Sequence, residues 1–85
     1  MIIVSQGKTA HINYDNIEAT YLLKKDDKIQ INMRGNYDYT IGEYETMERA
    51  KEVLQEIVTR YKNWANMKVG QPSGVCLPVY EMPGD

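Results

Sequence analysis

The chain has 85 residues, of which 26% are charged and 42% are hydrophobic, and its formal net charge at pH 7 is −2. This length fits one domain, 1–85, that buries only about 60–65% of the surface exposed by its unfolded chain. The slightly acidic charge balance excludes a general nucleic-acid binder, because such proteins need a clustered cationic surface.

Cysteine content and hydropathy indicate the compartment. The single cysteine, Cys76, excludes an internal disulfide and is compatible with a reducing environment. The apolar start, 1–4, is too short for a secretory leader and lacks a basic beginning. No segment approaches the roughly 18 apolar residues of a membrane span. We therefore expect a cytoplasmic protein that does not engage a membrane.

Alternating apolar and polar residues predict five short strands in the first half of the chain. Turn-forming pairs separate these strands, among them Asp15-Asn16 and Gly35-Asn36. Gly42 shifts the alternation, so that Tyr44 rather than Glu43 is the apolar position, and a β-bulge would explain the shift. Strands joined by tight turns pair antiparallel, so region 1–44 is predicted to form a five-stranded antiparallel meander. The expected strands cover 1–5, 10–14, 17–24, 29–34 and 37–44.

A long amphipathic helix is predicted over 46–66. Thr46 is a suitable N-cap, and Glu48 lies in the first turn, where the helix dipole favours negative charge. Apolar residues at spacings of three and four form a stripe that one face of the sheet would cover. The stripe consists of Ala50, Val53, Leu54, Ile57, Val58, Tyr61, Trp64 and Ala65. The predicted fold class is therefore α+β, with the meander packed on one long C-terminal helix.

The last part of the chain, 67–85, is predicted to be a loop followed by a final strand. The apolar segment 75–82 is long enough for a strand, and Pro78 assigns it to a sheet edge because proline has no N–H to donate. This strand could pair with its own sheet or with that of another protomer. Since a small domain gains stability by exchanging such a strand, we expect a homo-oligomer.

Catalytic and metal-binding motifs are not recognisable in the sequence. His11 is the only histidine and has no partner at ligand spacing, so it reads as a solvent-facing strand residue. A nucleophilic pair of Cys76 with His11 is conceivable only in space, and a small strand hydrophobe is the simpler role for Cys76. We predict no catalytic residue, no metal and no cofactor.

Six residues form the candidate ligand site. Tyrosine is unusually frequent, with seven copies against no phenylalanine. Aromatic faces can stack bases, arginine can clamp phosphate, and asparagine can read a base edge. If the final strand crosses to a neighbour, such groups could converge on a pocket between subunits; alternatively, the aromatics are core and the arginine is solvated. The residues are Arg34, Tyr37, Tyr39, Asn63, Trp64 and Tyr80.

Three segments carry a family resemblance. They are Met1-Ile-Ile-Val-Ser-Gln with the His11-Ile-Asn-Tyr-Asp-Asn-Ile that follows it, the block from Ile41 to Ile57, and the closing Tyr80-Glu-Met-Pro. This layout resembles small uncharacterised phage and prophage proteins of Gram-positive bacteria. It is also similar to the anti-Thoeris sponge proteins of phages, oligomers with an N-terminal antiparallel sheet, C-terminal helical structure and a last strand. No ligand-contacting residue is carried over from them.

The second resemblance implies a protein that binds a signal of the cyclic ADP-ribose type without cleaving it. The first hypothesis is therefore a non-enzymatic anti-defence protein that sequesters a small cyclic nucleotide in the host cytoplasm. The second is a protein–protein interaction module, with a pleckstrin-homology-like sheet and helix, that regulates a host protein through its sheet edge or aromatic face.

Overall fold

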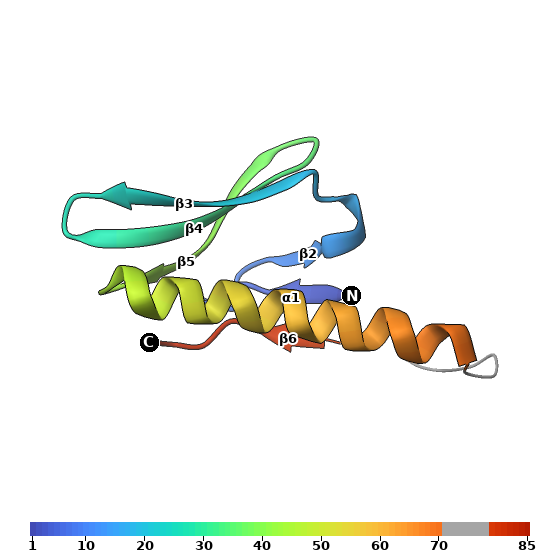
Figure 1. The fold of residues 1–85 in the computed structure, drawn as a ribbon. Coiled ribbons are helices and arrows are strands. Elements are labelled where there is room, and N and C mark those ends of the chain that lie inside the picture. The colour runs from blue at the N-terminus through green and yellow to red at the C-terminus, as the bar shows by residue number, and fades with distance from the viewer. Residues whose placement is uncertain (71–78) are drawn as a thin grey trace.

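The computed structural model describes residues 1–70 and 79–85, and it shows an α+β fold. Two three-stranded sheets pack with one long helix, α1 (Met47–Gly70), as Figure 1 shows. The α+β class and the single long helix predicted from the sequence are thus confirmed. No helix in this part of the chain combines the length and the apolar composition that crossing a membrane takes.

The first sheet joins the two ends of the chain. It contains β1 (Ile2–Val4), β2 (His11–Asn13) and β6 (Val79–Glu81), in the order β2-β1-β6. β1 pairs antiparallel with β2 and parallel with β6. The predicted final strand is therefore an edge strand that pairs within its own chain, and residues 75–78 of that prediction lie outside the described residues.

The second sheet is an antiparallel meander of β3 (Ala19–Lys25), β4 (Lys28–Arg34) and β5 (Asp38–Tyr44). Ile31 lies opposite Gly42 whereas Asn32 lies opposite Thr40, so β5 carries one extra residue, Ile41. This register shift confirms the predicted bulge. A Cβ at Gly42 would lie 3.0 Å from the Tyr44 ring and 3.2 Å from Cε of Met82, so the absence of a side chain lets both residues pack there.

The five N-terminal strands form, but they divide into two sheets instead of one continuous meander. The break falls at a short 3₁₀ helix, η1 (Tyr14–Asn16), between β2 and β3. Asp15 in this turn accepts a hydrogen bond from the Tyr61 hydroxyl at 2.7 Å and from the Met1 amino group at 3.4 Å. Asp15 thus joins the turn between the two sheets to α1 and to the start of the chain.

Helix α1 begins where the sequence predicts and ends later. The Arg49 N–H donates to Thr46 Oγ1 at 3.1 Å, which confirms the predicted N-cap. At the other end the helix continues to Gly70 rather than stopping at residue 66. Ala50, Val53 and Ile57 of the predicted apolar stripe are fully buried in the core, whereas Val58 of the same stripe is 41% exposed.

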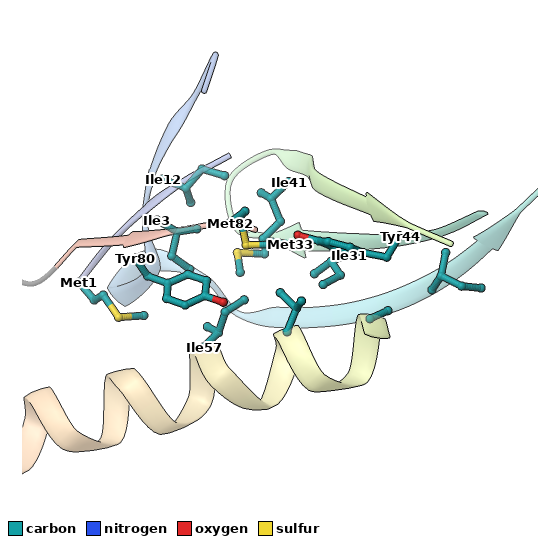
Figure 2. Packing of buried hydrophobic residues seen from close by; sticks show 13 residues of the cluster. Met1, Ile3, Ile12, Ile31, Met33, Ile41, Tyr44, Ile57, Tyr80 and Met82 are labelled. Carbon is teal, nitrogen blue, oxygen red and sulfur yellow. The ribbon is translucent and has the colours of Figure 1, made fainter. Parts of the chain in front are cut away.

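One hydrophobic core joins the helix to both sheets (Figure 2). Met82, just after β6, and Tyr80 within it are each 5% exposed, so the end of the chain contributes to the same core as its first residue. The core comprises Met1, Ile3, Ile12, Ile29, Ile31, Met33, Ile41, Tyr44, Ala50, Val53, Ile57, Tyr80 and Met82.

The side chain of Gln6 fastens the C-terminal segment to both sheets. Its Nε2 donates to the carbonyl oxygens of Glu43, Pro83 and Gly84 at 3.0, 3.2 and 3.0 Å. Its Oε1 accepts the Glu43 N–H at 2.8 Å, and its own N–H donates to the Ile41 carbonyl at 2.8 Å. Gln6, two residues after β1, thus connects β5 with the segment that follows β6.

Candidate ligand groove between helix α1 and strand β6

A groove of about 550 Å³ runs between α1 and β6. Its helical wall consists of polar residues three or four apart, which places them on one face of α1. Its opposite wall is Tyr80, the central residue of β6. The lining residues are Glu52, Gln55, Glu56, Thr59, Arg60, Asn63 and Tyr80.

Tyr80 is a fixed part of this groove. Its hydroxyl donates a hydrogen bond to Glu56 Oε1 at 2.7 Å. Burial of the ring, followed by the bond to Glu56, raises the pKa of Tyr80 well above its usual value. The hydroxyl is therefore neutral and remains a donor to Glu56 at physiological pH.

Arg60 lies over Tyr80, with its Cζ 5.6 Å from the centre of the ring. This distance is within the range of a cation–π interaction. The contact holds the positive charge of Arg60 at the mouth of the groove. Arg60 is itself exposed, so its guanidinium group can reach a ligand.

The acidic side chains of the groove are balanced by a second arginine. Arg49 Nη1 lies 3.4 Å from Glu52 Oε1 and 3.8 Å from Glu56 Oε2. Arg49 Nε also donates to the carbonyl oxygen of Asp85 at 2.8 Å. Farther along, the Gln55 amide donates to Thr59 Oγ1 at 3.3 Å. The groove therefore combines two carboxylates that share one arginine, neutral polar groups and one accessible cation.

The six residues predicted from the sequence do not form one cluster. Asn63 and Tyr80 line the α1/β6 groove. Trp64 instead packs beside Tyr61, with ring centres 5.5 Å apart, and Tyr61 contacts Tyr14 at 5.1 Å. Trp64 thus belongs to an aromatic cluster at the helix end of the core.

The other three predicted residues lie at the β4–β5 hairpin. Arg34 Nε bonds Asp38 Oδ1 at 3.1 Å, and this bond raises the pKa of Arg34. Tyr37 and Tyr39 meet edge to face with ring centres 6.5 Å apart. Both tyrosines line a hollow of about 150 Å³ that also includes His11. Convergence of the two groups across subunits stays a prediction.

Sequence reasoning missed Arg60 and, apart from Asn63, the groove's other helical residues. The sequence does show a polar helical face beside the apolar stripe, formed by residues 52, 56, 59, 60 and 63. Only the position of β6 identifies this face as one wall of a groove. The position of β6 could not be predicted, because its parallel pairing with β1 joins the two ends of the chain and has no local sequence signature.

The remaining chemical predictions concern His11, Cys76 and metals. His11 is an exposed residue of β2, as expected. Cys76 lies outside the described residues. Among the residues that the structure describes, no three His, Cys, Asp or Glu side chains are grouped to hold a metal ion.

Comparison with known proteins gave no match. No family model matches the chain, and no curated protein or solved structure is similar enough to count as a relative.

Proposed function

We propose that the protein binds a small nucleotide in the α1/β6 groove and releases it unchanged. The observation that carries this proposal is the arrangement of Arg60, Asn63 and Tyr80 around a space of about 550 Å³. Ligand pockets commonly have volumes of about 300–1,000 Å³ with a few polar groups that fix the ligand's orientation.

The lining residues supply the groups that a nucleotide needs. The Arg60 guanidinium can pair with a phosphate, and its plane can also stack on a base. The Asn63 and Gln55 amides can donate to and accept from base edges and ribose hydroxyls. An ADP-ribose derivative offers phosphates, hydroxyls and an adenine amino group together, so it matches this mixture better than a purely anionic ligand does.

Binding without turnover fits the state of the two groove carboxylates. Glu56 accepts the Tyr80 hydroxyl, and both Glu52 and Glu56 face Arg49. Carboxylates held by an arginine and a tyrosine hydroxyl can serve as fixed polar contacts to a bound ligand. Together with the sequence resemblance, this supports a phage-type anti-defence protein that sequesters an immune signal from its host's defence.

The proposal is tested by calorimetric titration with cyclic nucleotides, ADP-ribose and the cyclisation products of ADP-ribose. One member of the panel should bind, and chromatography should recover it intact. Arg60→Ala should weaken that binding about tenfold or more, since charged hydrogen bonds are worth about 1.5–3 kcal/mol. Lys62→Ala, an exposed helical site outside the groove lining, is the matched control. Absence of heat across the panel would refute the proposal.

The β4–β5 hairpin favours a second candidate function, a protein–protein interaction module. Tyr37 at its tip is 72% exposed and contacts Tyr39 edge to face. Exposed tyrosines are enriched at binding interfaces because they offer a large apolar area and a polar tip. A Tyr37→Ser variant should then lose a stoichiometric partner that the wild type recovers from host lysate, whereas Arg60→Ala should retain it.

A further inference from the structure

Strand β3 leaves one backbone edge unpaired. It lies at the end of the order β3-β4-β5, and all seven of its residues pair only with β4. Within the described residues, no other strand covers its outer side. By contrast, the far edge of the same sheet, β5, is partly covered by Gln6, which bonds the backbone of Ile41 and Glu43. A long open edge is a template for another strand.

We propose that this edge is the dimer interface of the protein, formed when β3 of two copies pairs antiparallel to give one six-stranded sheet. The two-fold axis passes through Tyr21, the exposed residue near the middle of the strand. This dimer is independent of the proposed ligand groove. It also leaves β6 paired within its own chain, unlike the strand exchange considered from the sequence.

Pairing of opposite charges favours the register that places Tyr21 on the two-fold axis. With Tyr21 on the axis, Lys24 of the second copy lies opposite Glu18, the residue just before β3, whose N–H donates to the Arg34 carbonyl; the same pair recurs across the axis. Both side chains are exposed in the single chain, so each is free to meet an opposite charge. A register centred on Leu22 would instead place Lys24 opposite Thr20 and lose both pairs. Opposite charges directly across antiparallel strands stabilise the pairing.

The apolar surface beside β3 matches the same register. Thr20 lines a hollow of about 260 Å³ together with Leu54 and Val58 of α1, and Val58 is 41% exposed. In the proposed pairing, Leu22 of the second copy lies opposite Thr20 and so faces this hollow. On the outer face, exposed Leu23 of the second copy lies beside Ala19. Both faces of the new strand pair therefore gain apolar contact.

The first experiment is a charge swap followed by sedimentation over a dilution series. The wild type should sediment as a dimer, at twice the 9.8 kDa of the chain. Glu18→Lys or Lys24→Glu alone should raise the dimer Kd about tenfold, because two attractive pairs become repulsive. The double variant, Glu18→Lys with Lys24→Glu, should restore the wild-type Kd. Lys51→Glu, the same charge change on exposed helix surface, should leave it unchanged.

The second experiment tests the register by crosslinking in a Cys76→Ser background. Tyr21→Cys places two thiols opposite each other at the axis and should form a covalent dimer on oxidation. Leu23→Cys, whose two copies lie far apart along the strands, should not. A wild type that stays monomeric at all concentrations, a Kd that the double variant fails to restore, or equal crosslinking of the two variants would overturn the inference. If the wild type stays monomeric, the β3 edge would be open to a strand of a different protein.

Discussion

Substitution of Met82 by alanine tests whether the end of the chain is part of the core. Met82 is 5% exposed, belongs to the central cluster and lies against Gly42 of the β5 bulge. Its N–H also donates to the Val4 carbonyl at 3.0 Å, which fixes the backbone there. The lost side chain would therefore leave a cavity that the neighbouring strands cannot easily close.

Buried methionine-to-alanine changes cost about 2–5 kcal/mol, and we expect about 3 kcal/mol here. A chain of 85 residues has a total stability of about 4–13 kcal/mol at about 0.05–0.15 kcal/mol per residue. The substitution should therefore remove a quarter or more of the stability. In a domain of this size each kcal/mol lowers Tm by about 4–8 °C, so Tm should fall by roughly 12–24 °C.

Trp64 provides the assay, because it is the only tryptophan and packs against Tyr61. Urea unfolding would be followed by its fluorescence at one fixed protein concentration, since association shifts the apparent stability. Val79→Ala is the matched control, because Val79 lies in the same strand segment but is 51% exposed. Its effect should stay within about 0.5 kcal/mol. Equal effects of the two variants would refute the burial of Met82 in the core described above.

Three further predictions follow from the packing at Gly42, the hydrogen bonds of Gln6 and the burial of Tyr44. Gly42→Ala should destabilise the fold by about 1–3 kcal/mol in urea unfolding, because its Cβ would press on the Tyr44 ring, whereas Gly84→Ala, which meets nothing within 4 Å, should not. Gln6→Ala should cost about 1–3 kcal/mol because it removes the hydrogen bonds of the Gln6 side chain to Glu43, Pro83 and Gly84. It should increase amide hydrogen exchange at Glu43, whose N–H loses its acceptor, and at Met82 and Gly84, whose segment is no longer held by the Gln6 amide. Burial raises the pKa of Tyr44 from 10.0 to about 12, so the folded state favours the neutral phenol. That stabilisation is complete below pH 10 and lost as pH rises towards 12, and a Tyr44→Phe variant should lose stability less steeply over that interval.

The local elements were readable from the sequence because each has a local physical cause. The Thr46 hydroxyl begins the helix, the apolar spacing that follows defines its buried stripe, and the changed alternation at Gly42 marks the bulge. These features depend on residues within a few positions of one another. Sequence reasoning therefore gave the α+β class, the hairpins and the final edge strand.

The separation into two sheets depends on distant contacts and was not readable. Asp15, in the turn where the sheets divide, accepts a hydrogen bond from Tyr61, which is 46 residues away. The parallel pairing of β6 with β1 likewise joins the two ends of the chain. For the same reason only a minority of the groove's lining residues were predicted. Asn63 and Tyr80 were singled out for their chemistry, whereas Arg60 becomes a candidate only through its position over Tyr80.

The most direct test of the α1/β6 groove is an amide chemical-shift titration of the ¹⁵N-labelled protein with the nucleotide that calorimetry identifies. We expect the largest shifts at Thr59, Arg60, Asn63 and Tyr80, with the β4–β5 hairpin unchanged. Shifts confined to Tyr37 and Tyr39, or no shifts at a saturating concentration, would contradict the assignment of the ligand to this groove.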